Sequence, residues 1–409
     1  MYVSRLQLKN FRNYPDLDLE FAPQHNVIWG DNAQGKTNIL EAIYLMSCAR
    51  SHRTAKDKEL INQAEDFYQV DLDYVRKNGS HETLGLRYES ELFGQAQLNN
   101  FLAQGGQWQG PESKGKAKRI IYYQGLELER LQELFGLFLA VIFAPEDLML
   151  IKKGPGERRR FLDILISQLS PSYFRQLQIY QKLLKQRNHI LKDIRDKERG
   201  RLDPETRQML RLNLDIWDQQ LAESGAFIVC KRHIILEELT KAAQEAMVTL
   251  SSRQEVLTLN YQKPSQLDPA AGQEAVQASF QQRLAQMREE DILRGYTAYG
   301  PHRDDLEMVL NGLSAQNYAS QGQQRSLVLS LKVAELAVLE HHCEEKPVLL
   351  LDDVMSELDQ ERRTRLFDLV SGNQVFLTCT DLQQVPHDIL TQDPRNRIFQ
   401  VQSGRVTRS

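Results

Sequence analysis

The stretch VIWGDNAQGKTNILEAIYLM, residues 27–46, decides the fold of this chain. It opens with a short apolar run that is typical of a strand, and residues 30–37 then match the pattern G-x-x-x-x-G-K-[ST] in full. From Asn38 the apolar residues recur at helical spacing. A glycine-rich loop between a strand and a helix turns backbone N–H groups and the helix N-terminus toward an anion. We therefore predict a nucleotide triphosphate site, against the alternative of a glycine-rich turn that holds a lysine by chance.

The residues of this loop have distinct predicted roles. Lys36 should reach the β- and γ-phosphates of ATP, and the Thr37 hydroxyl should ligate Mg²⁺. The glycines let the backbone N–H groups turn inward around the phosphate oxygens. The predicted nucleotide-binding residues of the loop are Gly30, Asp31, Asn32, Ala33, Gln34, Gly35, Lys36, Thr37 and Asn38.

The composition is that of an ordinary globular protein. The chain has 409 residues, of which 26% are charged and 41% hydrophobic, enough for two or three domains. No apolar run approaches membrane-spanning length and no signal peptide is evident, so we expect a cytoplasmic protein. The four cysteines form no C-x-x-C pair, so neither a zinc site nor a disulfide framework is predicted. With a net charge of −4, a nucleic-acid partner would require local basic patches.

The middle of the chain has a different pattern from its two ends. From about Pro171, apolar residues follow heptad a/d spacing in two segments, separated by KERGRLDPETR. We predict two long helices that fold back on each other as a short arm of roughly 40 Å, with an ordinary helical bundle as the alternative. The N-terminal part includes a hairpin that turns at Asn78-Gly79. From about Asp291 the α/β pattern returns, so the predicted parts are 1–165, 166–290 and 291–409.

The C-terminal part supplies the second half of the predicted ATP site. The apolar strand in PVLLLDDV ends in two aspartates, which is the Walker B arrangement. Asp352 should bind Mg²⁺, directly or through water, and Asp353 should orient the attacking water as a general base. The predicted catalytic residues are therefore Asp353, Asp352 and Lys36.

Two further motifs flank this strand. The segment S-Q-G-Q, residues 320–323, precedes a helical pattern and is similar to the signature motif of ABC-type ATPases. In that superfamily the signature covers the γ-phosphate held by a second subunit; the alternative is a capped helix without a ligand. Asp359, just after Walker B, lies where the D-loop crosses the same interface. Ser320, Gly322, Gln323 and Asp359 therefore complete the predicted nucleotide site.

The order and spacing of these motifs point to one family. The signature lies far beyond the P-loop, with a helical insertion between them, as in SMC-like ATPases rather than transporter subunits. The chain resembles the RecF family of bacterial recombination mediators, which are SMC-like, ABC-type ATPases. The motifs that carry this resemblance are LKNFRNY (8–14), GDNAQGKTNILEAI (30–43), RSHRTAKDKELI (50–61), FAPEDLMLIKKGPGERRRFLD (143–163), YGPHRDDLEMVLNG (299–312), ASQGQQRSL (319–327) and LLLDDVMSELD (349–359).

The resemblance implies a fold, ligands and partners. It implies an α/β ATPase head split by a mainly helical insertion, with ATP and Mg²⁺ as cofactors. It further implies an ATP-dependent homodimer on duplex DNA near single-strand gaps, slow ATP hydrolysis, and association with RecR, RecO and the RecA-loading pathway at the nucleoid. By motif position, Arg12 and Asn13 should contact the nucleotide.

The chain also departs from the broader ABC-type pattern. The second Walker B acid is Asp353 instead of the usual glutamate, so its carboxylate is one methylene shorter and slow turnover is expected. No histidine follows the strand in QVFLTCTD, and the Q-loop position is open between Glu146 and Asp147. The place of the switch histidine is taken by Thr378, Thr380 or Asp381.

Local basic segments are the candidate DNA contacts. Residues 182–201 hold eight basic and three acidic residues, and IKKGPGERRR (151–160) adds five more cations. A solvated helix face and internal ion pairs are the alternatives. His302, in GPHRDD, is either a metal ligand or a structural hydrogen-bonding residue. A third basic cluster follows the P-loop helix and comprises Arg50, Arg53, Lys56 and Lys58.

These observations favour an ATP-dependent DNA clamp over three rivals. An SMC-like nuclease-associated head would need an acidic nuclease cluster, which we do not find in the sequence. A transporter energy subunit conflicts with the long insertion. A scaffold with an inactive P-loop conflicts with the intact Lys36, Thr37 and Asp352.

Overall fold

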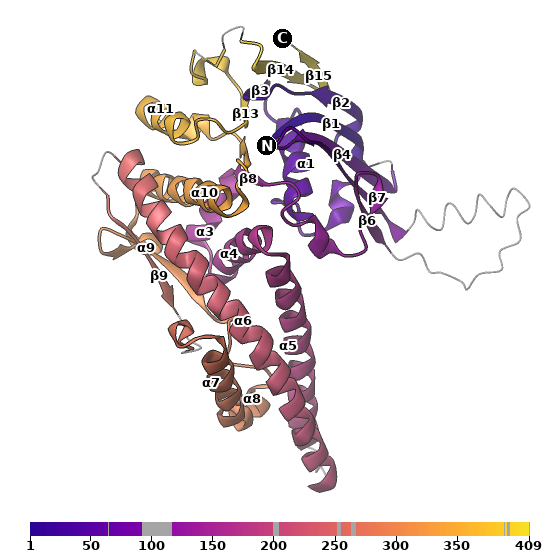
Figure 1. Cartoon of the computed structure of the whole chain (residues 1–409), viewed down its shortest axis with the longest axis vertical. Coiled ribbons are helices and arrows are strands. Elements are labelled where there is room, and N and C mark those ends of the chain that lie inside the picture. Colours follow the sequence, from indigo (N-terminus) through magenta and orange to yellow (C-terminus); the bar gives the residue numbers. More distant parts are fainter. Residues whose placement is uncertain are drawn as a thin grey trace, which may run out of the picture. The chain divides into compact units, whose positions relative to one another are not determined.

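The computed structural model describes residues 1–63, 65–91, 117–198, 204–251, 255–262, 267–387, 389–390 and 393–408 (Figure 1). The chain divides into two compact units. The head unit comprises Met1–Leu148, Thr249–Ser251 and Glu335–Ser409, and the arm unit comprises Met149–Val248 and Ser252–Ala334. The domain boundaries that the sequence predicts at 165/166 and 290/291 remain predictions.

A mostly parallel sheet forms the centre of the head unit. Its six strands follow the order β15-β14-β3-β13-β12-β8, and all but β15 run parallel to their neighbours. Strands β8, β12 and β13 are buried at every position, as their continuous apolar sequences predict for a parallel sheet. The bounds are β3 (His25–Trp29), β8 (Ala140–Phe143), β12 (Val348–Leu351), β13 (Val375–Cys379), β14 (Asn396–Gln402) and β15 (Arg405–Arg408).

A second, antiparallel sheet belongs to the same unit, in the order β2-β1-β4-β5-β6-β7. The predicted hairpin is confirmed: β4 and β5 are joined by a turn in which Gly79 adopts a φ of 83°, a conformation that glycine takes without strain. The bounds are β1 (Tyr2–Phe11), β2 (Tyr14–Glu20), β4 (Phe67–Val75), β5 (His81–Glu89), β6 (Lys118–Tyr123) and β7 (Leu126–Glu127).

Helix α1 (Lys36–Cys48) packs between the two sheets. It contacts β8 and β13 of the parallel sheet and β4 and β5 of the antiparallel one. Eleven of its residues are buried, because both of its sides face a sheet. The helix that begins at the P-loop is thereby fixed from two directions. Two further helices, α10 (Gln321–Cys343) and α11 (Gln360–Leu369), flank the Walker B strand in the sequence.

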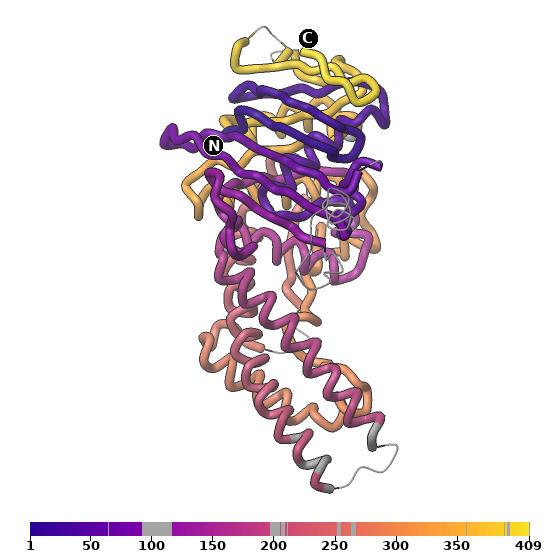
Figure 2. Tube along the Cα trace, turned by 90° about the vertical axis from the view of Figure 1, so that its right-hand side faces the viewer, coloured from indigo at the N-terminus to yellow at the C-terminus, as the bar shows by residue number. Residues whose placement is uncertain are grey.

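The arm unit contains the predicted helical hairpin. Helices α5 (Pro171–Glu198) and α6 (Pro204–Leu250) lie side by side and antiparallel (Figure 2). Leu191 and Ile194 of α5 pack against Leu214 of α6 and Ile292 of α8 in one buried cluster. The predicted antiparallel arm is therefore confirmed, whereas residues 199–203 of the separating segment KERGRLDPETR lie outside the described residues.

Shorter elements complete the arm unit. They include a three-stranded antiparallel sheet in the order β11-β10-β9. Among the described residues, no helix is both long and apolar enough to cross a membrane. The bounds are α3 (Met149–Lys152), α4 (Pro155–Leu169), β9 (Leu257–Gln262), α7 (Gln273–Gln286), α8 (Arg288–Arg294), β10 (Asp305–Leu310), β11 (Leu313–Ser314) and α9 (Ala315–Tyr318).

A buried ionic network ties α5 to α6 and α8. The Arg187 guanidinium is fully buried and donates to Asp218 at 2.6 Å, to Asp291 at 2.7 Å and to the Thr297 hydroxyl at 2.8 Å. Arg288 adds a second cation to Asp218 at 2.8 Å. Arg187 belongs to the basic segment 182–201, whose cations are candidate DNA contacts. The structure commits it to internal ion pairs, so it is not available to phosphates.

Replacing Arg187 with methionine should destabilise the arm strongly. Removing Arg187 leaves the buried Asp291 carboxylate without its cation and Asp218 with Arg288 alone, and breaking a buried ion pair in this way typically costs about 3–5 kcal/mol. The matched control is Arg175→Met on the exposed side of the same helix, with an expected change within about 0.5 kcal/mol. Urea unfolding monitored by circular dichroism measures both. Equal midpoints for the two variants would show that the network does not stabilise the arm.

Candidate nucleotide site

The candidate site lies at the carboxyl edge of the parallel sheet. The P-loop follows β3, the two Walker B aspartates follow β12, and β13 lies hydrogen-bonded between these strands. Parallel strands end at the same edge, so segments more than 300 residues apart in the sequence meet there. Gly30 N donates to the carbonyl oxygen of Cys379 at 3.3 Å, which joins the start of the loop to the end of β13.

Two loop glycines occupy positions that no other residue fits. Gly30 and Gly35 have φ values of 150° and 115°. A Cβ at Gly30 would lie 2.3 Å from the carbonyl oxygen of Val401, and one at Gly35 would lie 2.5 Å from Nδ2 of Asn13. The loop therefore forms a tight backbone cradle of the kind that holds phosphates. The loop tip, Asp31 to Ala33, is exposed.

Lys36 lies buried against this cradle. Its ammonium donates to the carbonyl oxygens of Gly30 at 2.7 Å and Asp31 at 2.8 Å. Burial lowers its pKa, and the charge of Asp353 is the strongest influence in the opposite direction. A partly desolvated cation beside inward-facing backbone groups is suited to hold the phosphates of a nucleotide.

Thr37 and Asp352 meet across the sheet. The Thr37 hydroxyl donates to Oδ1 of Asp352 at 2.9 Å, and the Thr378 hydroxyl donates to the same oxygen at 2.8 Å. Burial raises the Asp352 pKa, and these two hydrogen bonds oppose that shift. A hydroxyl and a carboxylate oxygen at this separation are ligands that Mg²⁺ accepts, so the residues fit the predicted metal.

Thr378 also holds the second Walker B acid. Its hydroxyl accepts a hydrogen bond from the Asp353 backbone N–H at 2.9 Å. Asp353 adopts a left-handed φ of 53°, which this bond fixes in place. Of the three open switch positions, Thr378 alone contacts both acids; Asp381 instead caps a short turn by accepting from Gln383 N at 2.9 Å.

The segment LKNFRNY contributes loop supports. Asn13 donates to the Gln34 carbonyl oxygen at 3.1 Å and accepts from the Asn38 side chain at 2.8 Å, so it braces both ends of the P-loop. The Tyr14 hydroxyl donates to the Gly35 carbonyl oxygen at 3.1 Å. Among the described residues, the side chains of Asn13 and Tyr14 contact the P-loop itself. The prediction that Asn13 contacts the nucleotide stays a prediction.

The contacts of Arg12 identify a buried residue, Glu41, that the sequence analysis did not single out. It forms a two-pronged ion pair with Glu41 of α1 at 2.7 and 2.9 Å and donates to the Glu59 carbonyl oxygen at 2.8 Å. Glu41 is fully buried and also accepts from the Ser51 hydroxyl at 2.5 Å. The available signal is a single carboxylate within the apolar run Ile39 to Met46. The predicted contact of Arg12 with the nucleotide stays a prediction.

The two candidate Q-loop residues lie just after β8. Asp147 accepts from the Ala144 backbone N–H at 2.8 Å and so closes its own turn. Glu146 is exposed, and its carboxylate lies 3.9 Å from Nε of Arg53. Because its side chain is not committed to the local backbone, Glu146 is the better candidate.

The predicted D-loop and signature residues cap helices. Asp359 of the head unit accepts from Arg362 N at 2.9 Å at the start of α11. In the arm unit, Ser320 N donates to the Gln323 side chain at 2.9 Å, and Gln323 N donates back to the Ser320 hydroxyl at 3.3 Å. This reciprocal pair is a capping box that leaves Ser320 exposed at the start of α10, next to Gly322.

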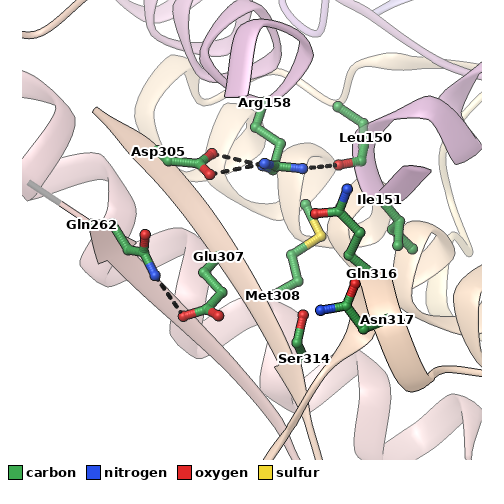
Figure 3. A pocket seen from close by; sticks show the side chains of 10 residues that line it. All are labelled: Leu150, Ile151, Arg158, Gln262, Asp305, Glu307, Met308, Ser314, Gln316 and Asn317. Atoms are coloured by element: carbon green, nitrogen blue, oxygen red, sulfur yellow. Dashed lines mark hydrogen bonds and ion pairs between the residues drawn. The ribbon is translucent and has the colours of Figure 1, made fainter. Parts of the chain in front are cut away.

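A polar pocket of about 220 Å³ lies close to α9, which precedes the signature (Figure 3). Arg158 crosses it and donates to both oxygens of Asp305 at 2.7 and 2.8 Å. Arg159 donates to the Asp304 carbonyl oxygen at 2.7 Å. Both arginines are among the candidate DNA contacts of the sequence. Arg158 is buried in this internal pair, so for this residue the structure supports the alternative of an internal ion pair.

The metal interpretation of His302 is also replaced by a structural one. Its Nε2 donates to the Thr297 carbonyl oxygen at 3.1 Å, which leaves Nδ1 to accept from the Tyr180 hydroxyl at 2.7 Å. Burial lowers the His302 pKa to about 4. His302 is therefore a neutral hydrogen-bonding residue inside the arm unit.

Replacing Asp352 with asparagine should stabilise the ligand-free protein. A carboxyl whose pKa is raised on folding destabilises the protein above that folded pKa, and a tenfold change in proton affinity corresponds to about 1.4 kcal/mol. Asparagine removes that cost at neutral pH, so the variant should melt at a higher temperature. The difference should shrink as the pH falls and wild-type Asp352 becomes protonated. Melting curves across pH 4 to 8 measure this, and a variant that melts lower throughout would contradict it.

Comparisons with known proteins support one family. The family model described as the RecF/RecN/SMC N terminal domain matches residues 2–387. The chain is similar to the DNA replication and repair protein RecF of Acetivibrio thermocellus, with 40% identity over 93% of this chain and 94% of the relative. It is 38% identical to the protein of the same name from Bacillus subtilis over the full length of both.

A solved structure agrees with the sequence comparisons. It is described as the recombination mediator protein RecF-ATPrS in the RecFOR pathway. It matches with a TM-score of 0.83 and 33% identity, covering 100% of this chain and 98% of that chain. Together with the P-loop, Walker B and signature segments described above, these similarities show that the chain belongs to the RecF family, with the SMC-like, ABC-type ATPase fold.

Proposed function

We propose that this protein is an ATP-dependent clamp on duplex DNA that acts in recombinational repair and replication. The observation that carries the proposal is the meeting of Thr37 and Asp352 at 2.9 Å beside the P-loop of a RecF-family chain. ATP would lie on the loop cradle, with Lys36 at its phosphates and Thr37 and Asp352 holding Mg²⁺. The solved relatives described with ATP and ATPrS support this assignment.

Dimerisation completes the proposed site. Ser320, Gly322 and Gln323 belong to the arm unit, and Ser320 is exposed at the N-terminus of a long helix, where an anion is favoured. These three residues would cap the γ-phosphate of ATP held by a second copy of the chain, and Asp359 would lie at the same interface. ATP would then join two heads, so nucleotide state would control the assembly.

DNA and protein partners follow from the family. The relatives are DNA replication and repair proteins, and the solved ones are placed in the RecFOR pathway. We propose duplex DNA and its single-strand junctions as the substrate, and RecR and RecO as partners in loading RecA. The exposed basic residues after α1, which include Arg53, Lys56 and Lys58, are candidate phosphate contacts.

Hydrolysis would act as a slow release timer, with no chemistry on DNA. Asp353 is half-buried and is held by Thr378, but its carboxylate is shorter than the glutamate that usually stands there. Water would be positioned less closely, which would make turnover slow. Release of the DNA would follow hydrolysis, because the signature of the second copy would lose the γ-phosphate.

The composite site can be tested by sedimentation with a gapped duplex. Wild-type protein should form a DNA-bound dimer with ATP and a monomer without it. Lys36→Arg should abolish the dimer by changing the phosphate contact, and Ser320→Arg should abolish it by blocking the partner's ATP. The Ser320→Arg variant should still bind ATP as a monomer, because its own P-loop is intact.

The control for this experiment is Thr364→Ala on α11, where an exposed hydroxyl donates to the Gln360 carbonyl oxygen of its own helix. This variant should dimerise as wild type does. Dimerisation that is independent of ATP, or that survives both Lys36→Arg and Ser320→Arg, would remove the signature from the nucleotide site. The scaffold alternative would then be favoured.

Thr378→Val should slow hydrolysis with little effect on ATP binding. Valine keeps the shape but removes the hydroxyl that bonds Asp352 and Asp353, and the loss of such a support typically costs about 10- to 100-fold. Higher Mg²⁺ should restore part of the rate, because Asp352 is less well oriented for the metal. Thr380→Val is the matched control, with a change of less than about 3-fold. A larger defect in the control than in Thr378→Val would contradict the assignment.

A further inference from the structure

From Arg175 to Lys192, the exposed face of α5 carries cations without carboxylates. No Asp or Glu occurs in the sequence between Asp163 and Asp193, although this segment contains four lysines and arginines besides its buried Arg187. Every exposed residue from Arg175 to Lys192 is Arg, Lys, Gln or His. The cations among them are Arg175, Lys182, Lys185 and Lys192, and His189 lies between the last two lysines.

These five residues share one line along the helix. At 3.6 residues per turn, the spacings of 7, 3, 4 and 3 keep successive side chains on the same side. Tyr180, Arg187 and Leu191 lie on the opposite side, where they are buried against α6 and α8. We call this line of five residues the cation track.

The cation track is not consumed by internal ion pairs. Within the part of the chain that the structure describes, Arg175, Lys182, Lys185 and Lys192 form none. His189 lies 3.3 Å from Asp193, near the end of the track. Since the Arg187 cation of the same helix is buried in ion pairs with Asp218 and Asp291, the cations outside such pairs lie on the outward side.

The other helix of the arm has a different outward face. Met209, Leu212 and Ile216 of α6 are 57%, 59% and 58% exposed, at helical spacing. Asp215 and Glu223 give the neighbouring surface of α6 carboxylates. The described surface of α6 thus differs from that of α5, whose exposed residues from Arg175 to Lys192 include no carboxylate.

We propose that the cation track binds the sugar-phosphate backbone of duplex DNA. From Arg175 to Lys192 it extends roughly 26 Å, the length of about seven phosphates along one strand. The exposed side chains between the cations are Gln178, Gln181 and Gln186. Glutamine amides donate to phosphate oxygens, whereas single-strand binding relies on exposed aromatic rings. The inference rests on the proposed function, because it names the surface by which the clamp holds DNA.

The test is the salt dependence of binding to a fluorescent duplex of mixed sequence, in the presence of ATP. The track variant combines Arg175→Gln, Lys182→Gln, Lys185→Gln and Lys192→Gln, which preserve helix propensity. Each phosphate contact contributes about 0.9 to the slope of log K against log salt, so the slope should fall in magnitude by about 3.6. Affinity should fall by up to roughly 4 × 10³-fold near 0.1 M salt and converge with wild type near 1 M.

The matched control removes four exposed cations elsewhere, by Lys9→Gln, Lys241→Gln, Arg405→Gln and Arg408→Gln. It has the same net charge as the track variant and should keep the wild-type slope. Melting temperature and ATP-dependent dimerisation verify that both variants are folded.

The possible outcomes test the cation track separately from the proposed function as a DNA clamp. If wild type binds duplex DNA with ATP but the track variant keeps its affinity and slope, the track is excluded and the clamp stands. A loss of affinity with an unchanged slope, or an equal loss in the control, also excludes the track. If the wild type itself binds no duplex, the proposed function fails and the track fails with it. Equal weakening on single strands would contradict the duplex preference.

Discussion

The hydrogen bond from Thr37 to Asp352 is the contact on which the nucleotide site depends. It joins the first residues of α1 to the end of β12 and can form only if β13 inserts between β3 and β12 in parallel register. The chain is interrupted by the whole arm unit between these strands. The sheet therefore brings the two halves of the site together, and the insertion can vary in length without moving them.

Much of the site follows from local sequence because its parts are short and chemically restrictive. The P-loop glycines are identifiable since a side chain at Gly30 would collide with the backbone of Val401. Asp352 is identifiable for a related reason: it is the first charged residue after a buried apolar strand, at the position where that strand ends. Likewise, Pro204 marks the start of α6, since its ring favours the first helical turn.

The parts that sequence could not predict depend on partners distant in the chain. Arg158 and Arg187 look like other cations until Asp305, Asp218 and Asp291 are brought to them by tertiary packing. Similarly, the choice of Thr378 among three residues rests on the side of β13 that faces Walker B. Thr378 lies within β13 whereas Thr380 and Asp381 follow its last residue, so the choice depends on where the strand ends and on what packs beside it.

Two ionisable side chains of the site, Lys36 and Asp352, are buried where their charged forms are disfavoured. Burial lowers the pKa of Lys36 and raises that of Asp352, so each ion is held in surroundings that disfavour its charged form. In the proposed complex, a nucleotide with its metal would supply the opposite charge to both at once, phosphate to the lysine and a cation to the aspartate. Ligand binding then relieves two unfavourable burials of charge, in a loop whose glycines and Asn13 contacts already fix the backbone. Any species that binds only the folded state stabilises that state. Nucleotide binding would therefore be strongly coupled to the stability of this edge of the sheet.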